Sequence, residues 1–295
     1  MSGLQELLGR ADVGELRAQL QMRGAGFSIG TTLDVTEQSG VLLMHRDDEA
    51  EVRQLGETGF ATFVNAESDA ICGLAVEVID NVLGAGLPAL FLYAYDEPWL
   101  LGERLCARLS GLLAREYVMV EDAWAWRVDR GARGWPPHRG VRSTLLKRSP
   151  PEVINAWVAL SKVAADQACI HVVPLDDDPG YPSALERVDA PLEHVRALPL
   201  SAGTALTWNA NLLHWGGPCS PRARGPRVSC SFTFCLASAA EDLGMKRVPL
   251  LDFDFRARLD AIARQIVTYG DGQPDVSADV ATWARANETL RKAKR

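Results

Sequence analysis

Hydrophobic residues recur at two different spacings along the chain, and the change of spacing divides it into three regions. Apolar residues at helical spacing occur within residues 1–25 and again within 100–115, where leucines mark one face of an amphipathic helix. From about 117 to 236 the apolar residues form short runs between turn residues, which is typical of strands. Helical spacing returns between 252 and 294. The pattern predicts a β barrel or sandwich between helical regions.

The same pattern predicts the individual elements. We expect helices at 1–25, 48–58, 67–81, 100–115, 252–269 and 276–294, and strands at 118–120, 123–128, 141–147, 153–160, 168–173, 204–208 and 227–236. The apolar, aromatic-rich run 89–95 fits either a strand or a buried segment. Residues 176–198 contain acidic residues and prolines, so we expect a loop or partly helical segment that is long enough to act as a lid.

Composition limits the class of protein. The chain has 295 residues, 47% hydrophobic and 23% charged, which is ordinary for a globular protein with a sizeable core. Its net charge of −7 argues against a nucleic-acid polymer as partner. Acidic residues and glycines interrupt the most apolar stretch, 71–95, so no membrane span is predicted. Six cysteines without a CxxC pair and no visible signal peptide indicate reduced thiols in a cytoplasmic protein.

Three polar signals follow one another in the predicted β region. His138 comes directly after a Gly/Pro-rich loop, 131–137; His214 follows a later turn, and Arg227 begins an Arg-x-Ser motif with Ser229. A non-haem iron site needs two neutral imidazoles with open positions opposite them. An arginine fork suits the bidentate binding of a carboxylate, and a nearby hydroxyl can add a hydrogen bond. In a strand, Arg227 and Ser229 project from the same face.

The ordered motifs of residues 89–236 resemble the phytanoyl-CoA dioxygenase-like branch of the iron(II)/2-oxoglutarate-dependent enzymes. The matching runs are Gly134-Trp135-Pro136-Pro137-His138-Arg139, Trp157-Val158-Ala159-Leu160-Ser161, Cys169-Ile170-His171-Val172-Val173-Pro174, Leu198-Pro199-Leu200-Ser201-Ala202-Gly203 and Leu212-Leu213-His214-Trp215. The resemblance implies a mainly β fold with bracing helices, in which a double-stranded β-helix (jelly roll, cupin-like) forms the core. We therefore expect a single domain over 1–295, with a helical bracing region at 1–115, the jelly-roll core at 116–238 and C-terminal helices at 239–295.

The resemblance also implies the roles of individual residues. His138 and His214 become iron ligands, Arg227 and Ser229 become the clamp for 2-oxoglutarate, and Asn155 becomes a further contact of the cosubstrate. The implied reaction couples oxidative decarboxylation of 2-oxoglutarate, which consumes O2, to removal of a hydrogen atom from an unactivated substrate carbon.

The chain departs from this family at Gly140, where an aspartate usually supplies the third iron ligand. Glycine cannot coordinate a metal, which leaves three interpretations: an inactive enzyme, a hydroxylase whose third ligand comes from elsewhere, or a halogenase. Halogenases that resemble this chain carry Gly or Ala at this position. Loss of the carboxylate opens an iron position and removes a negative charge, and both changes favour chloride. The intact His138, His214 and Arg227 argue against an inactive site. A non-catalytic β-barrel binding protein is the alternative from another class.

Charge suggests the substrate of such an enzyme. Between residues 127 and 148 there are seven basic side chains and a single acidic one, Asp129. They form either a solvated basic loop or a pocket rim that attracts an anionic small molecule. The expected substrate contacts are Arg127, Trp126, Arg139, Arg142 and His171, although the tryptophan and the histidine also fit ordinary core positions.

The resemblance extends to a halogenase that acts on free nucleotides in nucleoside-antibiotic biosynthesis. It implies a nucleotide such as a 2'-deoxynucleoside monophosphate, whose base and phosphate would suit aromatic faces beside arginines. A free amino acid or an alkaloid-like molecule is the alternative substrate.

Overall fold

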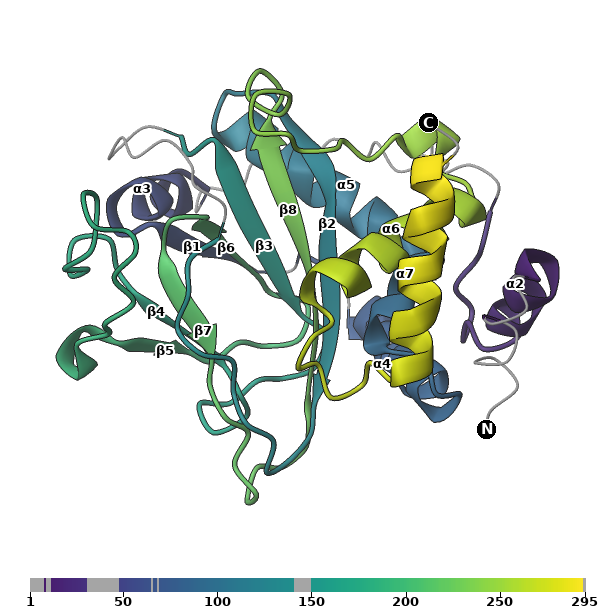
Figure 1. Cartoon of the computed structure of the whole chain (residues 1–295). Helices are drawn as coiled ribbons and strands as arrows, with labels where there is room; N and C mark the ends of the chain where they lie inside the picture. The colour runs from purple at the N-terminus through teal and green to yellow at the C-terminus, as the bar shows by residue number, and fades with distance from the viewer. Residues whose placement is uncertain are drawn as a thin grey trace.

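The computed structural model describes residue 8 and residues 12–30, 48–64, 66–67, 69–140 and 150–293. Two antiparallel sheets lie face to face, and helices cover the outer face of the larger sheet (Figure 1). The helices are α2 (Val13–Gln21), α3 (Asp48–Thr58), α4 (Asp69–Gly84), α5 (Asp96–Leu112), α6 (Phe255–Tyr269) and α7 (Ala278–Ala293), with short 3-10 helices η1 (Ala89–Ala94), η2 (Leu192–His194) and η3 (Leu250–Asp252). No helix in these ranges is long and apolar enough to cross a membrane.

The strands form the double-stranded β-helix expected from the sequence. They are β1 (Phe60–Phe63), β2 (Tyr117–Val128), β3 (Val153–Ala159), β4 (Ile170–Val173), β5 (Arg196–Leu198), β6 (Ala205–Asn209), β7 (Leu213–Gly216) and β8 (Arg227–Leu236). The larger sheet has the order β1-β6-β3-β8-β2 and the smaller one β5-β4-β7. All of the paired strands in these sheets are antiparallel. A register shift between Val120 and Ala123 marks a bulge in β2.

Alternation along the central strands separates the core from the cavity. In β3, Ile154, Ala156 and Val158 belong to the cluster packed under the helices, whereas Trp157 belongs to the cluster between the two sheets. Because successive side chains of a strand point to opposite faces, Asn155 shares the face of Trp157. The sequence of β3 therefore builds the core with one set of positions and the interior of the barrel with the other.

The structure confirms most of the predicted elements and adds three strands that were not predicted, β1, β5 and β7, of which β5 lies in the segment expected to be a loop or partly helical. The run 89–95 was expected to be either a strand or a buried segment, and the second alternative is confirmed, because residues 89–94 form the buried 3-10 helix η1. All six of its residues are buried, and periodicity cannot separate a strand from a short helix when every position is apolar. β1 lies inside the region expected to hold only bracing helices, and it pairs with β6 at the edge of the larger sheet. The strand expected at 141–147 lies outside the described residues. All six cysteines are buried and unpaired, as expected.

Candidate active site

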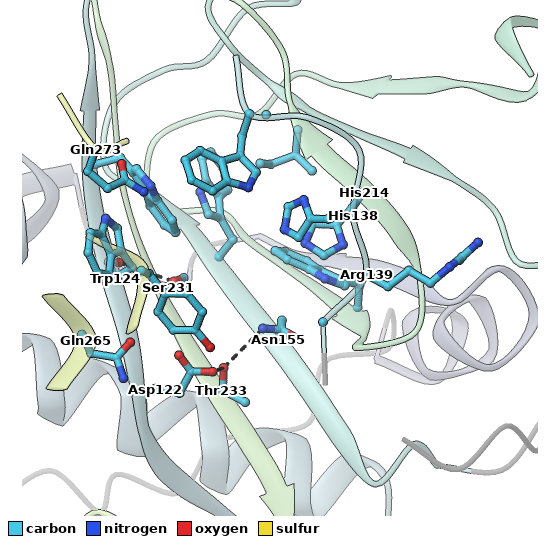
Figure 2. Close-up of a pocket in the computed structure, with 18 of the residues that line it drawn as sticks. Asp122, Trp124, His138, Arg139, Asn155, His214, Ser231, Thr233, Gln265 and Gln273 are labelled. Carbon is cyan, nitrogen blue, oxygen red and sulfur yellow. Dashed lines mark hydrogen bonds between the residues drawn. The ribbon is translucent and has the colours of Figure 1, made fainter. Parts of the chain in front are cut away.

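Two histidines lie side by side at one end of the barrel interior. His138 follows the loop after β2, and His214 is in β7. Each backbone N–H donates to the carbonyl oxygen of the other residue at 3.0 Å, which fixes the loop against the strand. The ring centroids are 4.3 Å apart (Figure 2). The sequence-based pairing of these residues is thus matched by direct contact between them.

Hydrogen bonds decide which ring nitrogens are available. Nδ1 of His138 lies 2.9 Å from the carbonyl oxygen of Pro136, and Nδ1 of His214 lies 2.9 Å from that of Leu212. A carbonyl only accepts, so each Nδ1 carries the proton and each Nε2 keeps its lone pair. Burial lowers the pKa of both rings, that of His214 to about 3, where the neighbouring His138 adds to the effect. Two neutral imidazoles with free Nε2 atoms fit a divalent iron ion.

Gly140 lies beside this pair and lines the same cavity. Its backbone N–H donates to the carbonyl oxygen of Ala210 at 2.7 Å. A Cβ added at Gly140 would lie 3.2 Å from that oxygen and 3.4 Å from Oδ1 of Asn155, which is close but not blocked. Among the described residues no three His, Cys, Asp or Glu side chains gather into a metal site. The following segment, 141–149, contains none of these residue types. The described site therefore offers two imidazoles that could coordinate a metal and no third side chain of these types beside them.

Asn155 connects this position to a polar chain in the cavity. Its Nδ2 donates to Oγ1 of Thr233 at 3.3 Å, and the Thr233 hydroxyl donates to Oδ2 of Asp122 at 3.1 Å (Figure 2). Oδ1 of Asn155 is buried without a hydrogen-bond partner. Two side chains therefore separate Asp122, the carboxylate in the cavity wall, from Gly140.

Arg227 is a buried cation in the cavity wall without an acidic partner among the described residues. Its guanidinium donates to the carbonyl oxygen of Ala168 at 2.8 Å and lies over the rings of Trp126 and Trp157. Its Nε and Oγ of Ser229 are buried without a partner. Burial lowers the pKa of Arg227 to about 10. Since an uncompensated buried charge is unfavourable, this pair of donors fits the carboxylate of a ligand such as 2-oxoglutarate.

The expected substrate contacts are only partly brought together. Trp126 and Arg139 line the cavity. Arg127 does not: its guanidinium pairs with Asp80 on α4 and with Asp129. His171 also lies outside the cavity lining, where its ring stacks on Trp215 at 5.4 Å. Arg142 is not among the described residues.

Arg139 lines the cavity, but its donors are already engaged. It forms a bidentate pair with Asp178, at 2.5 Å and 3.0 Å, and donates to the carbonyl oxygens of Leu185, Asn211 and Arg187. Arg139 therefore fastens the segment expected as a lid onto the barrel. Its saturation leaves little capacity for a substrate anion.

The cavity has a volume of about 440 Å³ and extends to a wall that sequence reasoning missed. The additional lining residues include Asp122, Trp124, Ser231, Thr233, Gln265, Tyr269 and Gln273. For the residues of β2 and β8 a signal existed, because they share strand faces with Trp126 and Arg227. For Gln265 and Tyr269 on α6, and for Gln273 in the loop after it, there was none, because a helical pattern does not say that a C-terminal helix and its following loop reach the barrel interior.

Comparison with known proteins gives a family match over the barrel. Residues 100–225 match the family model described as phytanoyl-CoA dioxygenase (PhyH). This is less than half of the chain, and it includes both histidines and Gly140 but ends before Arg227. Together with the histidine pair and the uncompensated arginine, the match supports the class of iron/2-oxoglutarate-dependent enzymes. A search of curated proteins gave no match.

Solved structures agree on the fold. The chain is similar to AviO1 from Streptomyces viridochromogenes Tue57, with 18% identity, a TM-score of 0.53, and coverage of 66% of this chain and 97% of that one. EvdMO1 has 18% identity and a TM-score of 0.50 over 64% of this chain and 50% of its own. SnoN, a non-haem α-ketoglutarate-dependent epimerase from nogalamycin biosynthesis, has 15% identity and a TM-score of 0.48 over 64% and 83%. At 18% identity the likeness to AviO1 and EvdMO1 establishes the fold alone, and nothing is inferred from SnoN, whose TM-score is below 0.5.

Proposed function

We propose that the protein is an iron(II)/2-oxoglutarate-dependent halogenase that chlorinates an aliphatic C–H bond of a small molecule. The observation that carries this proposal is Gly140, which lines the cavity beside two neutral histidines at the position where related enzymes place a carboxylate. Gly140 puts no side chain into the cavity there, and among the described residues no carboxylate joins the two histidines in a metal site. A monatomic anion such as chloride meets both conditions.

Each part of the site has a separate task in this proposal. His138 and His214 would hold the iron through Nε2. Bound iron would supply the oxidising chemistry, with 2-oxoglutarate and O2 as cosubstrates. Arg227, which lines the cavity, would orient the distal carboxylate of 2-oxoglutarate, and Ser229, two residues further along the same face of β8, would add a hydroxyl donor, because Nε of Arg227 and Oγ of Ser229 are both buried without a partner. The tryptophans around the cavity would exclude water from the reacting carbon.

A hydroxylase is the second candidate, and one observation favours it. The unpartnered Oδ1 of Asn155 faces the Gly140 position, and an acceptor oxygen suits a water molecule there better than a chloride. A chloride would be better placed if the amide turned so that Nδ2 faced it. The two orientations have the same shape. The Thr233 hydroxyl would then donate to Oδ1 of Asn155 and no longer to Asp122.

The substrate remains a proposal at a coarser level. We propose a small molecule that enters the aromatic cavity. The expected anionic character, with a nucleotide as its example, rested on arginines that the structure places outside the cavity or in saturated contacts, as for Arg127 and Arg139. The anionic character of the substrate therefore stays a prediction that the described residues do not support.

The test compares Gly140→Asp with Gly140→Ala as a matched control. Chloride is titrated under anaerobic conditions into protein loaded with iron(II) and 2-oxoglutarate, and the charge-transfer absorbance is followed. Wild type and Gly140→Ala should respond to chloride, and Gly140→Asp should not, because its carboxylate would fill the position. With a substrate in hand, mass spectrometry should show a chlorine isotope pattern in the product.

The result that would overturn the proposal is equally direct. Wild-type protein that binds 2-oxoglutarate but shows no chloride response, and whose product gains only oxygen, would be a hydroxylase. Protein that shows no iron–2-oxoglutarate absorbance at all would support the non-catalytic binding protein.

A further inference from the structure

The end of the cavity farthest from Gly140 along the polar chain is rich in hydrogen-bond acceptors. Asp122 lies on β2, and Gln265 reaches the same wall from α6 (Figure 2). The two are held together because Nε2 of Gln265 donates to the backbone oxygen of Glu121, the residue before Asp122, at 2.7 Å. Tyr269 also lines this end. We call this group of Asp122, Gln265, Ser231 and Tyr269 the acceptor end.

Gln265 has a fixed orientation and an unused oxygen. Because its Nε2 is engaged by a carbonyl, its amide cannot be turned around without losing that hydrogen bond. Its Oε1 is therefore an acceptor, and it is buried without a partner. Buried polar atoms are normally hydrogen-bonded, so this oxygen calls for a donor that the described residues do not provide.

Asp122 also has no cation beside it in the described part of the chain. The nearby basic side chains, Lys246 and Arg264, pair with Glu121 instead. Burial raises the pKa of the Asp122 carboxyl group. The Thr233 hydroxyl donates a hydrogen bond to Asp122, which lowers the pKa, but burial has the larger effect. A donor or a positive charge arriving beside Asp122 would favour its ionised form.

Aromatic side chains surround these acceptors. Trp124 and Tyr269 pack edge to face with centroids 6.3 Å apart, and Trp126 continues the wall toward Arg227. Such rings offer faces to a flat group and attract a cation. The cavity thus has different chemistry at its two ends: a buried arginine at one and acceptors among aromatic rings at the other.

We propose that the acceptor end is the recognition subsite for the substrate, and that it takes a flat group carrying N–H donors, such as an amidine or an amino-substituted ring. Asp122 and Gln265 accept the N–H bonds, and Trp124 and Tyr269 pack on the ring. The inference deepens the proposed function and rests on it in one respect, that the substrate occupies this cavity. Asp122 and Gln265 are specificity-determining residues in this arrangement.

The experiment measures binding, not turnover, so that it does not depend on iron or chloride. Benzamidine, benzamide and benzoate share a ring and differ in their donors, and their dissociation constants are measured for the metal-free full chain by ligand-observed NMR. Benzamidine and benzamide should bind at least ten-fold more tightly than benzoate. Asp122→Asn should weaken benzamidine at least ten-fold, and Gln265→Met should weaken both donor probes several-fold. Asp189→Asn, at an exposed acid outside the cavity, should change nothing.

A benzamidine affinity that is unchanged in both Asp122→Asn and Gln265→Met would overturn the proposal. Benzoate held at Arg227 is recognised because its affinity does not respond to Asp122→Asn. Thermal unfolding checks that each variant is folded. If Asp122→Asn does not fold, the affinity of Gln265→Met for the donor probes tests the proposal. If the probes do not bind at the acceptor end, the chloride titration of wild type and the Gly140 variants still tests the proposed function. If chloride has no effect, the binding measurements with the three probes still test the acceptor end.

Discussion

Two buried arginines show how the helical side of the molecule differs from the barrel interior. Arg258 on α6 is fully buried, and its charge is met by Asp96 at the start of α5, with further donation to the backbone oxygens of Phe253 and Ala94. Arg227 on β8 is almost as buried, yet no acidic side chain in the described residues meets it. Both groups keep one buried nitrogen without a partner, Nη2 of Arg258 and Nε of Arg227, but only Arg258 has its charge balanced by an acidic side chain of the described residues.

The difference shows that burial alone does not identify a functional cation. Both guanidinium groups are removed from water, and removal from water is costly for either charge. What separates them is whether the protein supplies the counter-charge. This criterion also explains Arg139, which lines the cavity but is closed by Asp178.

The largest effect is expected on the helical side. Arg258→Met should lower the free energy of unfolding by about 3–5 kcal/mol, because Asp96 would be left buried without its cation. Urea denaturation measures the loss. The double variant Arg258→Met/Asp96→Asn should recover part of it. A loss within experimental error would mean that Ser28 and the backbone of Gly30, which also donate to Asp96, suffice to hold the carboxylate.

The matched change in the barrel should affect binding instead. Arg227→Met should cost roughly 2–5 kcal/mol in 2-oxoglutarate affinity, because the distal carboxylate would be buried unpaired. The ligand-free protein should lose less than about 1 kcal/mol of stability, since the removed charge had no acidic partner. Anaerobic titration measures the affinity. Arg227→Lys is the control that keeps the charge but not the fork. Unchanged affinity would place the clamp elsewhere.

The sequence singled out the two histidines and Arg227, which the structure brings to one cavity, because their chemistry allows few substitutes; their roles stay predictions. Metal binding needs imidazoles and carboxylate binding needs a fork, so the residue type itself was informative. β8 was predicted at its observed bounds because its alternation is uninterrupted. Trp126 and Arg127 show the limit of counting residues in a cluster. As neighbours in one strand they must face opposite sides, so only one could line the cavity.

The rest of the site depends on contacts between distant segments. Arg139 looked like a free cation because its partner, Asp178, lies 39 residues away in the predicted lid. Gln265 gave no signal, because a single amide in an amphipathic helix has no pattern that points into a barrel. Partner identity and helix placement are properties of the tertiary structure, and composition cannot supply them.

The smallest expected effect concerns Asp122, at the other end of the cavity. There a substitution is expected to weaken ligand binding and to increase stability. Burial raises the pKa of this carboxyl group in the folded protein. Both states are protonated below about pH 4, so no penalty exists there. At higher pH the unfolded chain has already lost this proton while the folded protein still keeps it, so stability falls until the pH has passed the raised pKa of the folded protein. Asp122→Asn removes this titration.

Asp122→Asn should therefore be more stable than wild type at pH 7, and the difference should shrink as the pH falls below the unfolded-state pKa of aspartate, about 3.9. Urea denaturation at several pH values measures it. The same variant should bind benzamidine more weakly, which is the behaviour of a residue kept for a ligand at the expense of stability. If Asp122→Asn is instead less stable at pH 7, the ionised carboxylate already has a stabilising partner within the protein. Arg227 would then be the one of these two cavity residues whose buried charge lacks a partner of opposite charge among the described residues.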